Sequence, residues 1–304
     1  MRVDERTVKV IEMLMDGASG QKIAETLGVS RTAVWKMIKK LEAFGFKIEA
    51  KRRVGYRIVD MPDLSPYRVY KICSELEMVE DVYYYKTVDS TNDRAKEIGK
   101  PKVLVIAEEQ TAGRGRYGRR WISERGGLYF SITVPSLPIE DVPKLTLTAG
   151  VAVAEAIGGR LKWTNDVLMD GKKVCGILCE LFGEIENPLI VVGIGINVNN
   201  PVPPYATSLS KLHRRTLDRG EVLERVLKNL ERWYLRLVSG DWKSVRRRWK
   251  ELSDTLGRKV VVRSGGREIE GKAVDIDEDG ALVLERNGVL ERVYSGECFF
   301  IHRK

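Results

Sequence analysis

Residues 103–121 read VLVIAEEQTAGRGRYGRRW. The apolar run Val103–Ala107 is typical of a strand buried on both faces. The segment that follows interleaves three glycines with four arginines, and such a stretch cannot pack into a core. Glycine lets the backbone approach a ligand closely, and guanidinium groups bind phosphate or carboxylate through two parallel hydrogen bonds. Residues 103–121 therefore predict a buried strand followed by an anion-binding loop, with a flexible basic surface loop as the alternative.

Three more apolar runs predict buried strands, and two stretches with helical spacing lie among them. The runs are Leu128–Val134, Val174–Cys179 and Leu189–Ile196. The predicted helices are a small-residue helix over 145–157 and an amphipathic helix over 223–237. The central part of the chain is therefore expected to form a sheet covered by helices.

Polar clusters stand near the ends of these strands. Asp89-Ser-Thr-Asn92 precedes a predicted helix, and capping of that helix is the simpler interpretation of its hydroxyl groups. Lys162-Trp-Thr-Asn-Asp166 is followed by the hairpin turn signal Asp170-Gly171, so Asp166 and Lys173 are predicted to face each other across a tight hairpin. A surface salt bridge is the alternative. In Gly193-Ile-Gly-Ile-Asn197 the small residues of a buried strand leave room for something flat.

The segment before Asp63 has the spacing of a helix-turn-helix. A short helix ends at Gly17, Ser19 can cap a second helix through Leu27, and Ser30 can cap a third over 31–44. Alternating residues from 46 to 58 then predict a two-stranded wing. Basic side chains on the third helix and the wing tip are predicted to contact DNA, the alternative being a solvated basic face on a three-helix scaffold. The candidate DNA-binding residues are Arg31, Thr32, Lys36, Lys39, Arg52 and Arg53.

From about residue 254 onward, short strands alternate with Gly265-Gly266, Asp279-Gly280 and Asn287-Gly288, which predicts a small β-barrel. We therefore expect three domains, at residues 1–63, 64–253 and 254–304, and an α+β multidomain fold. A chain of 304 residues is long enough for this.

The amino-acid composition limits which partners and which kinds of catalytic or metal site the protein can have. The net charge of +9 permits a nucleic-acid or nucleotide partner without demonstrating one. Two histidines are too few for a three-histidine metal site, and four scattered cysteines do not form a disulfide framework. There is no signal-peptide core and no run of eighteen apolar residues, so we expect a cytoplasmic protein with no membrane partner. The chemistry is therefore expected to depend on Lys, Arg, Asp and a bound metal ion.

The order and spacing of these motifs resemble those of the biotin protein ligases, specifically the two-function form called the biotin operon repressor. The matching segments are Ser90-Thr-Asn92, Gly113-Arg-Gly-Arg-Tyr-Gly-Arg119 with Trp121, Lys162-Trp-Thr-Asn-Asp166, Lys173-Val-Cys-Gly-Ile-Leu178 and Gly193-Ile-Gly-Ile-Asn197. Thr164 stands where proline is usual in the family, and Tyr117 where a basic residue is frequent.

The resemblance implies a winged helix, a central mixed sheet with helices on one side, like that of class II aminoacyl-tRNA synthetases, and an SH3-like barrel. It also implies a two-step reaction. Biotin and ATP first give biotinyl-5′-adenylate and pyrophosphate, with Mg²⁺ as a cofactor, and a lysine of the biotin carboxyl carrier protein then takes the biotinyl group. The further partners implied are operator DNA with two-fold symmetry and a second copy of the chain when the adenylate is bound.

The family's site residues are carried over by motif position. Lys173, Arg116 and Asp166 are the catalytic candidates, and Asp166 is also the candidate Mg²⁺ contact and proton acceptor. The biotin-binding candidates are Ser90, Thr91, Asn92, Gln110, Arg114, Gly115, Arg116 and Lys173. The nucleotide-binding candidates are Arg119, Arg120, Trp121, Asn165, Asp166 and Asn197. Two alternatives remain, a biotin-sensing transcription factor without ligase activity and a lipoate or octanoyl ligase.

Overall fold

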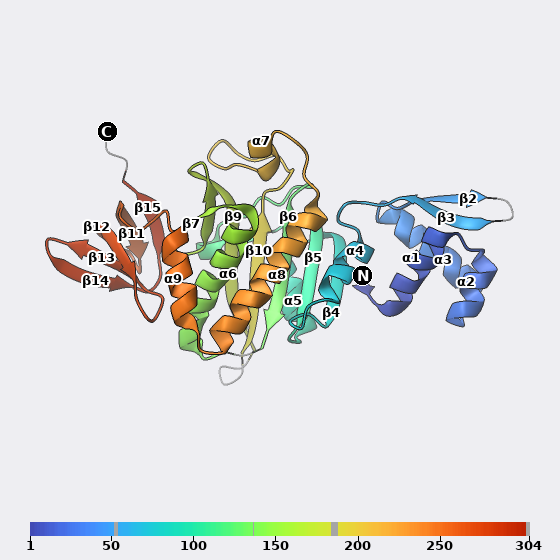
Figure 1. The fold of residues 1–304 in the computed structure, drawn as a ribbon, viewed down its shortest axis with the longest axis horizontal. Helices are drawn as coiled ribbons and strands as arrows, with labels where there is room; N and C mark the ends of the chain where they lie inside the picture. The colour runs from blue at the N-terminus through green and yellow to red at the C-terminus, as the bar shows by residue number, and fades with distance from the viewer. Residues whose placement is uncertain (52–53, 136, 184–187, 302–304) are drawn as a thin grey trace.

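The computed structural model describes residues 1–51, 54–135, 137–183 and 188–301. Viewed along its shortest axis, the molecule has the N-terminal helices at one end, a large sheet in the middle and the C-terminal strands at the other end (Figure 1). The predicted α+β multidomain class is confirmed, because the described strands form an eight-stranded, a five-stranded and a two-stranded sheet. No helix in the described ranges is long and apolar enough to cross a membrane.

The N-terminal part forms the predicted helix-turn-helix and wing. Its elements are β1 (Arg2–Val3), α1 (Glu5–Asp16), α2 (Gly20–Leu27), α3 (Arg31–Ala43), β2 (Lys47–Lys51) and β3 (Gly55–Asp60). Ser19 and Ser30 cap α2 and α3, each accepting a 3.1 Å hydrogen bond from a backbone N–H three residues on. Strand β1 was not predicted. It pairs with strand β4 (Asp81–Val88) at the edge of the large sheet and not with the strands of the wing.

The central part alternates strands and helices as expected. Its remaining elements are α4 (Pro66–Cys73), α5 (Thr91–Ile98), β5 (Val103–Gln110), β6 (Leu128–Val134), α6 (Val142–Ile157), β7 (Arg160–Lys162), β8 (Asp166–Met169), β9 (Lys172–Phe182), β10 (Leu189–Ile196), α7 (Leu209–His213), α8 (Arg219–Val238) and α9 (Trp242–Leu252), with 3₁₀ turns at Arg116–Gly118 and Ile139–Asp141. The sheet order is β1-β4-β5-β6-β10-β9-β8-β7. It is mixed because β4 and β5 run parallel while β5 and β6 run antiparallel.

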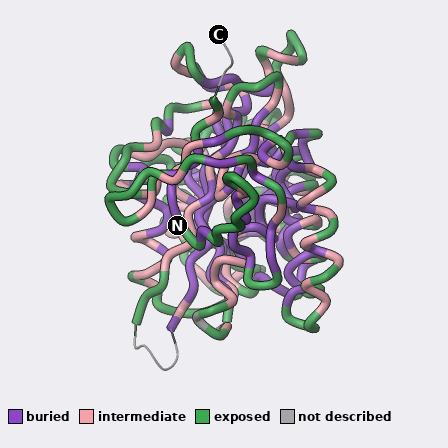
Figure 2. Tube along the Cα trace, turned by 90° about the vertical axis from the view of Figure 1, so that its left-hand side faces the viewer, coloured by how far each residue is buried: buried purple, intermediate pink, exposed green. Residues whose placement is uncertain are grey.

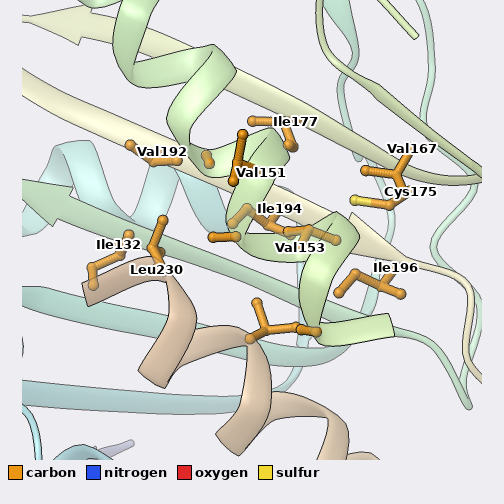
Figure 3. Packing of buried hydrophobic residues seen from close by; sticks show 14 of the residues in the cluster. Ile132, Val151, Val153, Val167, Cys175, Ile177, Val192, Ile194, Ile196 and Leu230 are labelled. Atoms are coloured by element: carbon orange, nitrogen blue, oxygen red, sulfur yellow. The ribbon is translucent and has the colours of Figure 1, made fainter. Parts of the chain in front are cut away.

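The two faces of this sheet carry different partners. Leu104, Ile132 and Ile194 point into the main hydrophobic core, which also holds residues of α6 and α8. Figure 3 shows this packing, with Val151 and Val153 of α6 against the strands, and Figure 2 shows the buried segments gathered inside the molecule. On the opposite face, Val103, Val105 and Val191 pack against Ala95 of α5. The expectation of helices on one side therefore needs a correction, because α5 lies on the second face.

The C-terminal part contains the predicted short strands and one more. They are β11 (Lys259–Ser264), β12 (Arg267–Ile276), β13 (Leu282–Arg286), β14 (Val289–Val293) and β15 (Glu297–Phe300), in the order β14-β13-β12-β11-β15. Strand β15 was not predicted, because four residues that include Cys298 and two phenylalanines give no clear alternation. Its place beside β11 depends on tertiary pairing.

A buried arginine joins the linker to the central sheet. Arg219, at the start of α8, forms ion pairs with Asp63 (2.7 Å) and with Glu108 of β5 (2.6 Å), and its side chain is only 10% exposed. The Tyr84 hydroxyl donates to the Leu64 carbonyl at 2.6 Å beside this group. Burial alone would raise the pKa of the Asp63 carboxyl, but the hydrogen bonds and charge of Arg219 lower it. The linker is therefore held by charge as well as by packing.

We predict that Arg219→Met lowers the free energy of unfolding by about 3–5 kcal/mol, because it leaves two partly buried carboxylates without their cation. Chemical denaturation followed by circular dichroism measures this change. The matched control is Arg125→Met, which breaks the exposed 3.2 Å pair with Glu109, the neighbour of Glu108 on β5. We expect that control to cost about 1 kcal/mol or less. Equal losses from the two variants would contradict the prediction.

Candidate functional site

A cavity of about 620 Å³ opens on the α5 face of the large sheet. Every residue assigned to biotin, nucleotide or catalysis from the sequence lines it. These are Ser90, Thr91, Asn92, Gln110, Arg114, Gly115, Arg116, Arg119, Arg120, Trp121, Asn165, Asp166, Lys173 and Asn197. The fold thus brings together side chains from α5, β5, the Gly-Arg loop (residues 113–120), the β8–β9 hairpin and the end of β10.

Glycines on β9 and β10 form the floor of this cavity. Gly176 lies opposite Gly195 in the antiparallel register. A Cβ added at Gly195 would lie 2.4 Å from Trp121 Nε1, and one at Gly193 would lie 2.2 Å from Asn92 Oδ1. The missing side chains therefore leave the space that Trp121 and Asn92 occupy. The Nε1 of Trp121 is buried against β10 and has no hydrogen-bond partner among the described residues.

Lys173 and Asp166 meet inside the cavity. Their side chains form a 2.6 Å ion pair, and Lys173 Nζ lies 5.2 Å from the centre of the Trp121 ring. Asp170 and Gly171 both have positive φ, as the predicted hairpin turn requires. The predicted meeting of Asp166 and Lys173 is confirmed, but they are not opposite in register, because Lys173 pairs with Leu168 and Asp166 pairs with Gly176, beyond a bulge between Val167 and Leu168.

One end of the cavity is lined by hydrogen-bonding groups. Ser90 occupies the N-cap position of α5, yet its side chain makes no capping hydrogen bond, so the simpler capping interpretation is wrong for this hydroxyl. Gln110 Oε1 accepts from the Thr91 backbone N–H at 2.8 Å, and Gln110 Nε2 donates to Ser123 Oγ at 2.8 Å. The end of the cavity is therefore already organised in the protein alone.

Acidic side chains and a carbonyl hold the Gly-Arg loop on both sides of the cavity. Arg114 pairs with Asp93 of α5 at 2.5 Å and with Glu180 of β9 at 3.1 Å. Burial alone would raise the pKa of the Glu180 carboxyl, but hydrogen bonds from Lys96 and Asn92 lower it. On the other side, Arg119 forms an ion pair with Glu297, and Arg116 Nη1 donates to the Gly296 carbonyl at 3.2 Å.

The sequence analysis did not identify several groups that line the cavity. Phe299 and Phe300 come from β15 of the C-terminal part, and Lys162 Nζ lies 5.9 and 5.2 Å from their ring centres. Pro201, Pro203 and Tyr205 come from the segment between β10 and α7. A local pattern signals neither group, because each depends on how separate parts of the chain pack together.

The candidate DNA-binding residues divide into two sets. Arg31, Thr32 and Lys36 are exposed on α3, and Lys39 is exposed beside Glu42, with which it pairs at 2.7 Å. Trp35, which the sequence analysis did not select, is 51% exposed between them. Arg52 and Arg53 lie outside the described residues.

No group of three or more His, Cys, Asp or Glu side chains within the described ranges is arranged to hold a metal ion. Asp166 is the carboxylate that lines the cavity. Mg²⁺ commonly takes one or two carboxylates together with substrate phosphates and water. The donor set therefore fits a metal ion that is shared with a bound nucleotide better than a metal site built by the protein alone.

Three family models match separate parts of the chain. Residues 6–57 match an HTH domain, residues 84–197 match the biotin/lipoate A/B protein ligase family, and residues 255–301 match the biotin protein ligase C-terminal domain. A bifunctional ligase/repressor BirA of Bacillus subtilis is 36% identical over 300 residues, which cover 92% of each chain. The chain belongs to the biotin protein ligase family. Its form is that of the bifunctional ligase/repressors, because the similarity includes the helix-turn-helix.

Two further comparisons agree with membership of the biotin protein ligase family. The bifunctional ligase/repressor BirA of Escherichia coli is 31% identical over 313 residues, 95% of each chain. The solved structure of a biotin protein ligase from Aquifex aeolicus in complex with biotin and ATP has a TM-score of 0.66 and 33% identity. It covers 73% of this chain and 99% of the Aquifex chain. The family resemblance inferred from the sequence is therefore confirmed.

We predict that Glu297→Gln loosens the Gly-Arg loop, because it removes the carboxylate that pairs with Arg119. Trypsin cleaves after arginine, so limited digestion with mass-spectrometric mapping should show cleavage within residues 114–120 several-fold faster than in the wild type. Glu268→Gln is the matched control, since it breaks an exposed pair with Arg263 on the β11–β12 hairpin. Unchanged loop cleavage in Glu297→Gln would contradict the prediction.

Proposed function

We propose that this chain joins biotin to ATP as biotinyl-5′-adenylate, transfers the biotinyl group to a lysine of a biotin carboxyl carrier protein, and represses transcription from a two-fold operator. The observation that carries the enzymatic part is one cavity in which a polar end, a lysine and an aromatic-over-glycine floor follow one another. Family membership supports the same assignment. The C-terminal match, which is to biotin protein ligases, favours biotin over lipoate.

The order of groups along β10 suggests how two substrates would lie. Asn92 lies over Gly193, Trp121 lies over Gly195, and Asn197 follows the strand. From Gly193 to Asn197 an extended chain rises about 13 Å, so these groups lie at separate places along the floor of the cavity. We place the biotin head beside Ser90, Thr91 and Gln110, and the nucleotide beside Trp121, Asn165 and Asn197. Their reacting groups would then meet near Lys173.

The first step needs positive charge more than a covalent catalyst. An oxygen of the biotin carboxylate attacks the α-phosphorus of ATP, and the bond to pyrophosphate breaks. Lys173 and Arg116 are proposed to offset the repulsion between these two anions and to stabilise the charge that develops. Asp166 would contribute one oxygen to Mg²⁺. When bound, the metal ion would neutralise part of the phosphate charge.

The second step transfers the acyl group. The carrier lysine attacks the acyl carbon of the adenylate, an amide bond forms, and the bond to AMP breaks. An unperturbed lysine has a pKa of about 10.4, so the attacking amine must lose a proton. We propose Asp166 as the acceptor because it lies in the cavity beside Lys173. Arg114, Arg116 and Arg119 would keep the loop over the adenylate and exclude water.

The DNA-binding part of the proposal rests on α3 and the wing. The exposed residues Arg31, Thr32, Lys36 and Lys39 would contact the major groove and its phosphates. Arg52 and Arg53, which lie outside the described residues, remain candidates from the sequence. One helix-turn-helix reads one half-site, so a two-fold operator requires a dimer. We propose domain boundaries of 1–63, 64–253 and 254–304. The first domain contacts the second through β1, through Asp63 and through the ion pair of Glu12 with Lys71, among other points.

We predict that Lys173→Ala lowers the rate of biotinyl-adenylate formation at least tenfold, because the ammonium stabilises charge in the transition state. Pyrophosphate release from biotin and ATP measures this step. Lys172→Ala is the matched control, since Lys172 is the exposed neighbour on β9 and does not line the cavity. Adenylation that is equal in the two variants would remove Lys173 from its proposed role.

We predict that biotin with ATP promotes dimerisation and tightens operator binding. Ordering the Gly-Arg loop costs conformational entropy, so a partner surface that meets an already ordered loop binds more readily. By linkage, dimerisation must strengthen adenylate binding by the same factor. Sedimentation and operator titrations, with and without the two substrates, measure both effects. An unchanged mass together with unchanged operator affinity would refute the coupling.

A further inference from the structure

Lys162 ends β7, the strand at one edge of the large sheet, and its side chain lines the cavity. Figure 1 shows β7 on the side of the sheet nearest the C-terminal strands. The polar end of the cavity lies elsewhere on the sheet, where Gln110 of β5 meets Thr91 of α5. Strands β6, β10, β9 and β8 separate β5 from β7, so Lys162 stands at the opposite end of the cavity from these polar groups. It has no role in the two steps proposed above.

One row of cross-strand partners connects Lys162 with the place where the substrates would react. Lys162 pairs with Asp166 on β8, and Asp166 pairs with Gly176 on β9. A Cβ added at Gly176 would lie 3.4 Å from Lys173 Nζ, so the Lys173 ammonium lies over this glycine. Cross-strand partners share a face of the sheet, and two strand spacings amount to about 10 Å. Lys162 is therefore on the cavity face, about two strands beyond Lys173.

Two aromatic rings of the C-terminal sheet hold the Lys162 ammonium. Its Nζ lies 5.2 Å from the centre of the Phe300 ring and 5.9 Å from that of Phe299. A ring face attracts a cation but has no net charge, so this contact does not neutralise the ammonium. Lys173, in contrast, shares its charge with Asp166 in a 2.6 Å ion pair. No carboxylate within the described ranges forms an ion pair with Lys162, whose positive charge is therefore available to an anion in the cavity.

The geometry of phosphoryl transfer indicates which anion lies there. The attacking and leaving oxygens lie roughly in line on opposite sides of the phosphorus. The biotin carboxylate would approach the α-phosphorus from the polar end, so pyrophosphate would leave toward β8 and β7. When the bond between the α-phosphorus and the bridging oxygen breaks, its electron pair passes to pyrophosphate. A fixed cation on that side stabilises the negative charge that develops.

We propose that Lys162 is a catalytic residue of the first step, which binds the β- and γ-phosphates of ATP and stabilises the leaving pyrophosphate. Phe299 and Phe300 are positioning residues that hold its ammonium. The inference rests on the proposed function, because it takes biotin and ATP as the substrates. Biotinyl-5′-adenylate has no β- or γ-phosphate, so Lys162 and the two rings serve adenylation and not the transfer to the carrier.

The two half-reactions of the full chain, measured separately, test this inference. Lys162→Met is expected to lower kcat/KM for ATP about tenfold or more in pyrophosphate release from biotin and ATP. Transfer from synthetic biotinyl-5′-adenylate to a biotin carboxyl carrier protein should stay within about twofold of the wild type. Unchanged adenylation overturns the proposal. A transfer rate that falls by the same factor as adenylation also overturns it.

Lys259→Met is the matched control for the loss of one positive charge. Lys259 is exposed on β11, its carbonyl accepts from the Ile301 N–H at 3.1 Å just after β15, and it does not line the cavity. We expect both half-reactions to keep their wild-type rates in this variant. Adenylation that falls as much as in Lys162→Met would show that only the overall charge matters, which overturns the proposal.

Two further variants separate charge from shape at this position. Lys162→Arg keeps the positive charge and is expected to recover most of the adenylation that Lys162→Met loses. An arginine variant as slow as Lys162→Met contradicts the proposed role. Melting temperatures show whether each variant is folded, and Lys162→Gln, which also lacks the charge, replaces Lys162→Met if the latter is not.

Phe300→Leu tests the positioning role of the aromatic ring. We expect it to slow adenylation about threefold or more and to leave transfer unchanged, because the ammonium loses a ring that holds it. Added to Lys162→Met, it should cost less than about twofold, since no ammonium then remains to be held. Independent, multiplying losses overturn the positioning role. Wild-type protein that releases no pyrophosphate from biotin and ATP overturns the proposed function instead.

Discussion

The site depends on one packing constraint, which is that β10 must be buried on both faces and still form the floor of a cavity. The face of β10 toward α6 and α8 is apolar and buried, because Val192, Ile194 and Ile196 belong to the main core. On the other face a Cβ at Gly193 or Gly195 would collide with Asn92 or Trp121. Alternation of apolar residues with glycine therefore allows one strand to stabilise the fold and to leave room for Asn92 and Trp121, which line the cavity.

Charge pairs organise the Gly-Arg loop before any ligand is present. Arg114 is held by Asp93 and Glu180, and Arg119 is held by Glu297. These pairs are partly exposed, so each contributes little to global stability. Their effect is local, because they reduce the number of conformations that a glycine-rich loop must lose when it closes on a ligand. Glu180 also fixes Asn92, so one carboxylate orders both the loop and the polar end of the cavity.

The C-terminal sheet is part of the site. Strand β15 contributes Phe299 and Phe300 to the cavity wall, while Gly296 and Glu297 bind two loop arginines. The linker at the other end of the molecule is likewise tied to the central sheet, through Arg219 and through β1. Contacts therefore run from the winged helix to the C-terminal strands through the sheet that carries the site.

The sequence by itself determined the elements with strong local signals. The bounds of β6 and β10 were predicted correctly, because seven consecutive buried positions in each strand leave few alternatives. The helix caps at Ser19 and Ser30 and the turn at Asp170-Gly171 were also predicted correctly, since capping and positive φ are local properties. The residues of the cavity could be named because the family's motifs carry them.

Only the tertiary structure decided how these pieces meet. Pairing of β1 with β4, the position of β15 and the placement of α5 on the second face depend on contacts between residues far apart in the chain. Ser131 lies within the apolar run of β6, and only the structure shows that its hydroxyl lies within hydrogen-bond distance of Thr91 and Asn92. A polar group's role depends on which donors and acceptors surround it, and local sequence does not contain that information.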